Sequence, residues 1–493
     1  MAIVHYQPEF RPALPCVFAS KDYHEFRDTL VEMDRMLAVS GIEHRFIAER
    51  IAEAGKALSA KQLDRRCTHL RLALRHCILL AITGLSFREL ARRMADSHLF
   101  QWFVHTGKID AVRPVSKSTI ERFEKMFDAD DVAGLIHNLN RAVADADGAR
   151  KLLYREAALR FDAIFADTTC VKANIHFPVD WVLLRDATRT LMNAVALIRR
   201  RGLKHRVGPP ESFIREMNKL CIEMTHTRKK KDAKKVRKKV FRRMKKLMKT
   251  IEGHGRSYHA LLEERWCETG WGEFEAQVVL DRIQGILDQL PQAVHQAHER
   301  IIGGRRVANA EKILSLYEPD IHVLVRGKAG AEVEFGNGLY LAEQSDGLIV
   351  DWDFMESQPR ADSKLVKPSL ERIAGNYAAP GSYTGDRGFD ARANDIVLEE
   401  LGIINGICPR SVPALREKLQ DEGFCLLQKR RGGTEGRIGI FKNAYLGRPL
   451  RSKGFANRKT RIEWCVLGHN LWKLATMAAQ KRAEIEAEPA AAA

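Results

Sequence analysis

Long apolar runs are missing from this sequence of 493 residues. Its longest strongly apolar stretches, such as 77–85, are much shorter than the roughly 20 residues that a membrane-spanning helix needs. Residues 1–10 also lack the basic and then apolar pattern of a secretory signal. We therefore expect a cytoplasmic protein that has no membrane partner.

Three further kinds of site have no signature in the sequence. The nine cysteines are scattered and include no close pair, which argues against both a disulfide framework and a structural zinc site. His295 and His298 lack the HExxH spacing of a zinc pair, and we expect them to face solvent. No glycine-rich phosphate loop precedes a Lys-Ser or Lys-Thr pair, so ATP use is not expected.

Positive charge is abundant and concentrated in one segment. The chain has 81 Lys and Arg against 63 Asp and Glu, a net charge of +18. Residues 199–249 hold 21 basic and 4 acidic side chains, so the rest of the chain is nearly neutral. This concentration predicts a polyanionic partner, either nucleic acid or an acidic membrane surface.

The basic run 228–249 also carries an apolar stripe at helical spacing. We favour a DNA-facing helix, because dense positive charge neutralises phosphates. A solvated helix is one alternative, and helix pairing or dimer contact through the apolar stripe is another. The candidate DNA contacts in this run are Lys229, Lys230, Lys231, Lys234, Lys235, Arg237, Lys238 and Lys239.

The N-terminal region has the periodicity of an all-helical domain from about residue 23 onward. Ser86 with Glu89, and Ser118 with Glu121, have the spacing of capping boxes and predict helices over 86–103 and 118–127. Residues 86–127 are consistent with a helix-turn-helix that places Lys117 and Arg122 near the major groove. Consecutive capped helices are also common in helical domains that do not bind DNA.

Strand patterns place two aspartates at strand ends. Alternation in 161–167 predicts a strand that ends at Asp167, and SYTGD predicts one that ends at Asp386. Between them, 321–327, 333–343 and 347–355 predict a meander, followed by a helix over 363–374. Strand ends are common positions for catalytic carboxylates, although each aspartate alone is explained as well by a cap or turn.

Glu435 completes a set of three acids on separate elements. If its segment is helical, Arg431 and Lys442 share its face. A solvated ion pair is the alternative interpretation of these spacings. Three such carboxylates match the need of phosphoryl transfer for two divalent cations, and Mg²⁺ suits oxygen ligands. Glu463 is a rival third acid, but it lacks a cation at both of these spacings and lies at the start of an apolar helix.

The motifs around the three acids resemble a known family. FADTT, YTGDRGF and the R-x3-E-x6-K spacing from Arg431 to Lys442 resemble the catalytic motifs of DDE transposases of bacterial insertion sequences. IHFPVDWVLLRDATRTL and GHNLWKLA extend the resemblance over most of the chain. The subgroup that fits is the long-chain, ISNCY-like type, which has a helical insertion after the first strand. One departure is Gln428, where the family often has Tyr.

The resemblance implies a ribonuclease H-like α/β fold, a mixed sheet flanked by helices. Asp167, Asp386 and Glu435 would be catalytic and would bind two Mg²⁺ ions, with Mn²⁺ as a substitute, and Arg431, Lys442 and Arg387 would contact DNA. The expected organisation is a helical DNA-binding region at 1–150, the catalytic domain at 155–190 and 306–480, a basic all-helical insertion at 191–305, and a tail at 481–493.

The function that the resemblance implies is transposition. The enzyme would bind the terminal inverted repeats of an insertion sequence as a homodimer on double-stranded DNA, cleave the ends and transfer them to target DNA. It would act in the prokaryotic cytoplasm, associated with the nucleoid. Two alternatives stay open, a catalytically silent DNA-binding regulator derived from a transposase and a metal-dependent nuclease without strand transfer.

Overall fold

The chain divides into two compact units in this computed structural model. One unit, called the first unit, comprises Met1–Lys172, Gly338–Met355 and Pro359–Ala493. The other, called the second unit, comprises Ala173–Asn337 and Glu356–Gln358. The structure describes residues 13–53, 55, 58–106, 112–227, 232–328, 331–447 and 449–491.

The N-terminal part of the first unit is helical, as predicted. Its α3 starts at the capping box of Ser59 and Gln62 and ends at Gly84, whose φ of 61° favours glycine. Most side chains from Leu70 to Ala81 in α3 are buried. The helices of this part are α1 (Lys21–Val39), α2 (Ile42–Glu53), α3 (Ala60–Thr83), α4 (Phe87–Asp96), α5 (His98–Phe103), α6 (Lys117–Glu124), α7 (Ala129–Ala144) and α8 (Ala146–Leu153).

The helix start at Ser86 is confirmed, but the extent of that helix and the start of the next one need correction. The helix that begins after Ser86 does not continue to residue 103, because Ser97 interrupts it and its side chain accepts the N–H of Phe100 to start α5. Ser116, and not Ser118, caps α6 by accepting the N–H of Thr119.

Among the described helices, no single one has the length and hydropathy of a membrane span. The bent pair α3–α4, whose axes differ by 106°, passes this test by length and composition only.

A mixed sheet of six strands contains the predicted meander. Its order is β2-β3-β1-β5-β6, and β4 pairs with β3. β3 is antiparallel to both β2 and β4, whereas β1–β5 and β5–β6 are parallel. The strands are β1 (Ala163–Lys172), β2 (His322–Lys328), β3 (Ala331–Glu343), β4 (Ile349–Phe354), β5 (Ser382–Thr384) and β6 (Ile404–Asn405).

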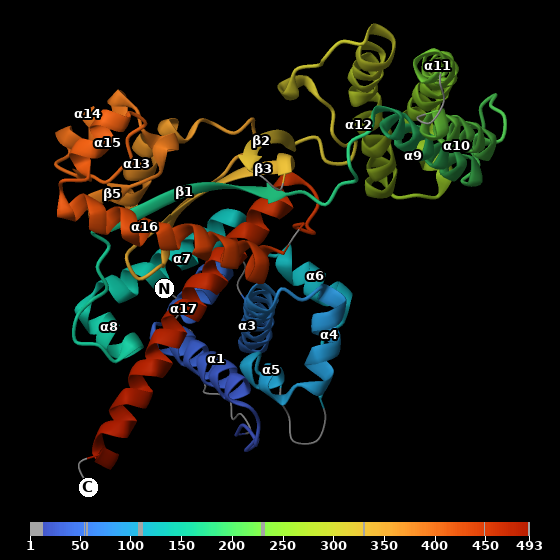
Figure 1. Cartoon of the computed structure of the whole chain (residues 1–493). Helices are drawn as coiled ribbons and strands as arrows, with labels where there is room; N and C mark the ends of the chain where they lie inside the picture. The colour runs from blue at the N-terminus through green and yellow to red at the C-terminus, as the bar shows by residue number, and fades with distance from the viewer. Residues whose placement is uncertain are drawn as a thin grey trace. The chain divides into compact units, whose positions relative to one another are not determined.

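Helices flank this sheet. α16 packs along β1 and α13 packs on β4, as Figure 1 shows for the first of these pairs. Short π- and 3₁₀-helices connect several of the elements. The remaining elements of the first unit are η5 (Asp362–Lys364), α13 (Val366–Asn376), η6 (Arg387–Phe389), α14 (Arg392–Glu400), α15 (Val412–Lys418), α16 (Glu422–Ile440), η7 (Phe441–Leu446) and α17 (Phe455–Ala491).

The long helix α17 joins the N-terminal helices to the sheet. It packs on α1, α3 and α7 (Figure 1), and it also contacts β4. Asn470 of α17 donates to the carbonyl of Ile349 in β4 at 2.7 Å, and Asn140 of α7 donates to the same oxygen at 3.1 Å. One hydrophobic core therefore includes residues of the N-terminal helices, the sheet and α17.

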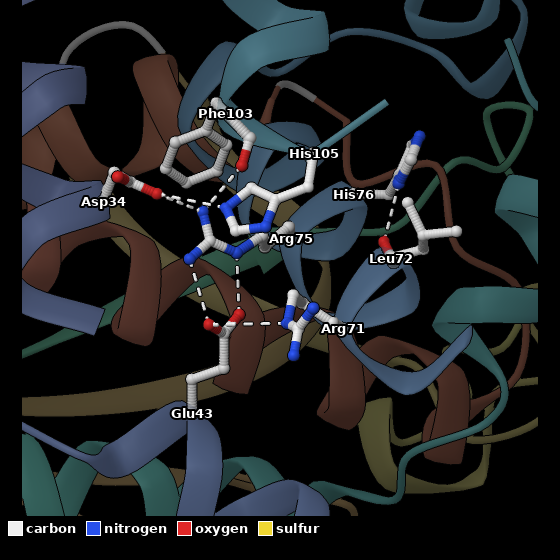
Figure 2. A network of polar contacts seen from close by, with 8 residues as sticks. All are labelled: Asp34, Glu43, Arg71, Leu72, Arg75, His76, Phe103 and His105. Atoms are coloured by element: carbon white, nitrogen blue, oxygen red, sulfur yellow. Dashed lines mark hydrogen bonds and ion pairs between the residues drawn. The ribbon is translucent and has the colours of Figure 1, made fainter. Parts of the chain in front are cut away.

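A buried ion network connects α1, α2, α3 and α5 (Figure 2). The guanidinium of Arg75 is 1% exposed and donates to Glu43, Asp34 and the carbonyl of Phe103, with its Nε 2.7 Å from Glu43 Oε1. Nearby in the same view, burial lowers the pKa of His76 to about 4, and its Nδ1 donates to the carbonyl of Leu72. We interpret this network as structural, because its charges are paired and enclosed.

The second unit has its own helical core. In α11 the apolar stripe expected from the sequence, including Val240, Met244 and Ile251, is buried in that core. The stripe therefore packs inside the unit against α9 and α12, with the basic side chains on its other faces. The elements of this unit are α9 (Asp180–Arg200), α10 (Pro210–His226), α11 (Ala233–Arg265), η2 (Trp266–Thr269), α12 (Glu273–His298), η3 (Glu299–Gly303), η4 (Asn309–Glu311), β2 and the start of β3.

Candidate active site

Asp167 lies within β1 and not at its end, which corrects the sequence prediction. The strand runs on to Lys172 because the residues after Asp167, Thr-Thr-Cys-Val, favour the extended conformation. Asp167 is half-buried, and one of its carboxylate oxygens accepts the N–H of Thr168 at 2.7 Å.

The strand register brings Asp386 next to Asp167. β1 and β5 are parallel, and Phe165 pairs with Thr384. Asp167 and Asp386 each lie two residues beyond their member of this pair. Because the two strands are parallel, both aspartates lie on the carboxyl-terminal side of the pair. Asp386 follows β5 and caps η6, accepting the N–H of Gly388 at 2.7 Å. The capping role offered as an alternative from the sequence is therefore present in the structure.

Glu435 lies on α16, the helix that packs along β1. The predicted helix is confirmed for Arg431 and Glu435, whereas Lys442 falls in the π-helix η7. Glu435 is exposed and Arg431 is half-buried. The Nε of Arg431 donates to Gln428 at 3.0 Å, which orients the guanidinium along the helix.

The three acids share one electrostatic environment. Burial is the main cause that raises the pKa of Asp167 to about 6, and the carboxylates of Asp386 and Glu435 raise it further. The N–H of Thr168 and the Arg431 guanidinium act in the opposite direction. Asp167 is thus a carboxylate whose negative charge is not fully compensated by its neighbours.

The chemistry of these three carboxylates suits a hard divalent cation. Three carboxylates from separate elements are the ligands that Mg²⁺ prefers, and a cation would relieve their mutual repulsion. Within the described ranges, no group of three or more His, Cys, Asp or Glu side chains already has the arrangement that could hold a metal ion.

A fourth carboxylate, Asp362, lies at the same place and was missed in the sequence. Its Oδ1 accepts the hydroxyl of Thr168, next to Asp167, at 2.9 Å. A Cβ at Gly388 would lie 2.5 Å from Asp362 Oδ2 and 2.9 Å from Asp386 Oδ1, so the two carboxylates border the same point. Asp362 lies in a short 3₁₀ turn far from Asp167 in the chain, and no periodicity marked it.

Two side chains tie α16 and η7 to the strands that carry the aspartates. Gln428 donates to the carbonyl of Gly406 at 2.6 Å and to that of Gly385, which precedes Asp386, at 3.3 Å. Lys442 donates to the hydroxyl of Thr169 at 2.9 Å. Gln428, the departure from the family motif, therefore has a specific structural role.

Glu463, the rival third acid, has a different environment. It is buried in α17, and burial raises its pKa to about 8. The groups that influence it are Trp352, Lys459 and Asp130, none of which belongs to the Asp167 site.

The predicted DNA contacts lie on several elements. Lys117 and Arg122 of α6 are exposed, as is Arg387 beside Asp386. On α11, Lys234, Lys235 and Lys239 are exposed, and Lys238 is half-buried. Arg237 is also half-buried and donates to Thr227 at 3.2 Å, which turns it toward the unit. Lys229, Lys230 and Lys231 lie outside the described residues.

A basic pocket between α9 and α10 was not anticipated from the sequence. It has a volume of about 360 Å³ and is lined by Arg185, Arg189, Asn193, Ile214 and Asn218. Guanidinium and carboxamide groups are donors that suit phosphate oxygens. The spacing of Arg185, Arg189 and Asn193, four residues apart on one helix, is the sequence signal that could have revealed it.

Comparison with known proteins supports a transposase family. Residues 24–126, which include α3 and the ion network of Figure 2, match the family model described as a transposase domain (DUF772). A search of curated proteins and a search of solved structures each found no match. The match suggests a transposase role for this chain.

Proposed function

We propose that this protein is a DDE transposase with a ribonuclease H-like catalytic core, which cleaves the ends of an insertion sequence and transfers them to target DNA. The observation that carries the proposal is the register of β1 and β5, in which Asp167 and Asp386 each lie two residues beyond a paired residue, with Glu435 on the helix that packs along β1. The transposase-domain match over 24–126 supports the same activity from a different part of the chain.

In this proposal the three carboxylates are the metal ligands. Asp167, Asp386 and Glu435 would hold two Mg²⁺ ions, or Mn²⁺ in their place. When bound, these cations supply activation of the attacking oxygen and stabilisation of the leaving oxygen in an in-line displacement. Arg431 and Arg387, beside the acids, would contact the phosphodiester and orient it. The positive charge of Arg431 also favours the charged form of Asp167. Lys442, which donates to Thr169, has the further role of fixing η7 to β1.

DNA binding would use the basic surfaces. In this proposal the exposed lysines of α11, together with Arg185 and Arg189 of the pocket between α9 and α10, would contact phosphates. Lys117 and Arg122 on α6 are the candidates for contacts to the terminal repeats. Because two ends must be joined, we propose a homodimer on DNA, in the cytoplasm of a prokaryote. Light scattering of the DNA complex should give two protein chains per pair of ends.

The experiment that tests the activity uses DNA that carries the sequences flanking the gene. Native protein with Mg²⁺ should produce both cleaved ends and joined products. Asp167→Asn and Asp386→Asn should bind the same DNA with native affinity at low divalent cation concentration and produce neither. If native protein cleaves without joining, it is a nuclease, and if it binds without cleaving, it is a silent regulator.

A further inference from the structure

The helix that carries Glu435, α16, has a low intrinsic helix propensity around that residue. Gly432, Gly433, Gly436 and Gly439 lie within α16, and each glycine disfavours a helix by about 1 kcal/mol relative to alanine. At Gly432, Gly436 and Gly439 an added Cβ would meet no atom within 4 Å, so packing does not require glycine there. The position of Glu435 must therefore be fixed by contacts elsewhere on the helix.

Those contacts converge on one buried carboxylate, Glu343, at the end of β3. Glu343 is 5% exposed and accepts the hydroxyl of Thr434 at 2.7 Å. The Nε of Arg437 lies 2.8 Å from both of its oxygens, and Arg430 Nη1 lies 3.1 Å from Oε1. Arg430, Thr434 and Arg437 are spaced four and three residues apart, so one face of α16 is held against β3.

The turn after β3 completes this attachment. Arg430 also donates to the carbonyls of Gln344 at 3.0 Å and Ser345 at 2.7 Å. Gly347, at a φ of 91°, leaves room for Arg437, because a Cβ there would lie 3.1 Å from the Arg437 Cδ. Glu435 directly follows Thr434 and, with Arg431, lies on the adjacent face of the helix.

We propose that Glu343 is a positioning residue for the acid site, which sets the location of the Glu435 carboxylate by clamping α16 through Thr434, Arg437 and Arg430. This inference rests on the proposed function, since it assumes that Glu435 is a metal ligand. Residues that orient ligands from behind typically change metal affinity about 10–100-fold when they are replaced.

The test compares Glu343→Gln with a matched control on the neighbouring strand. Asp351 of β4 is 4% exposed and forms a bidentate pair with Arg372 at 2.7 and 2.8 Å. Asp351→Asn therefore breaks a carboxylate–arginine pair of the same kind and burial without touching α16. Both variants should lose thermal stability, so stability alone does not distinguish a clamp from an ordinary buried pair.

Mn²⁺ binding to the DNA-free protein, measured by calorimetry, is the distinguishing readout. Glu343→Gln should weaken Mn²⁺ binding about tenfold, whereas Asp351→Asn should bind Mn²⁺ as native protein does. Hydrogen exchange at 430–440 should accelerate in Glu343→Gln only. Native Mn²⁺ affinity in Glu343→Gln, or an equal loss in Asp351→Asn, would overturn the proposal.

A second pair of variants keeps the test valid if Glu343→Gln does not fold. Thr434→Val removes one hydrogen bond to Glu343, and Thr434→Ser retains the hydroxyl. Weaker Mn²⁺ binding in Thr434→Val that Thr434→Ser restores would support the clamp, and equal affinities in both would contradict it. If Asp167→Asn abolishes Mn²⁺ binding and the clamp variants do not affect it, only the positioning role fails. If Asp167→Asn binds Mn²⁺ as native protein does, the proposed function fails as well.

Discussion

Gln428 donates a hydrogen bond of 3.3 Å to the carbonyl of Gly385, the residue that immediately precedes Asp386. The same amide donates to Gly406 at 2.6 Å, and its oxygen accepts from Arg431. One side chain of α16 therefore connects the helix of the third acid with the loop of the second.

Replacing Gln428 should lower activity without affecting DNA binding. We expect Gln428→Ala to reduce the cleavage rate about tenfold, because groups that orient ligands indirectly act on this scale. Gln420→Ala is the matched control, since Gln420 is exposed and its side-chain amide donates to the carbonyl of Arg416 in the adjacent α15. Single-turnover cleavage at saturating DNA measures both variants, and equal rates would remove Gln428 from the site.

The pH dependence of stability should reveal Glu463. Its pKa in the folded protein is raised to about 8 by burial, above its ordinary value of 4.5. Between these pH values the unfolded chain releases a proton that the folded protein retains, so this group's contribution to stability is lost as pH rises from 4.5 to 8. Glutamine does not titrate, so Glu463→Gln should not lose stability in this way. The melting temperature of the variant minus that of native protein should therefore increase between pH 5 and pH 8. A difference that does not vary with pH would contradict the assignment.

The ion network of Figure 2 should contribute strongly to stability. Arg75→Met would leave the carboxylates of Asp34 and Glu43 buried without the guanidinium between them, which costs about 3–5 kcal/mol of unfolding free energy. Lys151→Ala, which breaks the exposed pair with Asp147, should change it by less than about 1 kcal/mol. Urea denaturation measures both changes, and similar small effects would show that the buried network is dispensable.

DNA affinity should depend on the exposed lysines of α11. Replacing Lys234, Lys235 and Lys239 with alanine should weaken binding to all DNA sequences alike. The slope of log K against log salt should become shallower by about 0.9 for each phosphate that the protein no longer neutralises. Lys151→Ala again serves as the control for removal of a surface charge. An unchanged slope in the triple variant would exclude α11 from the DNA interface.

The sequence named the three acids as candidates but did not name the side chains that contact them or their helices. Alternation correctly predicted a strand at Asp167, whereas the strand predicted to end at Asp386 ends two residues earlier, at Thr384. Glu435 was proposed from the motif spacing. The end of β1 was wrong because strand propensity continues through Thr168 and Thr169. The break at Ser97 was missed because the helical period continues across it.

Asp362 and Glu343 were missed for a different physical reason. Asp362 meets Thr168 through a contact that spans 194 residues, and Glu343 meets Thr434 across 91 residues. Such contacts depend on the register of the sheet and on how helices pack over it, which a local pattern does not specify. At Glu343 the sequence shows only a charged residue at the end of a strand.

The identity of the third acid is the central claim, and a pair of matched substitutions tests it directly. In single-turnover, Mg²⁺-dependent cleavage of DNA that carries the flanking sequences, Glu435→Gln should lower the rate at least about a hundredfold, the scale on which removal of a charge-stabilising group acts at an active site. Glu463→Gln should cleave at the native rate. Native activity in Glu435→Gln together with loss of activity in Glu463→Gln would contradict the proposed site.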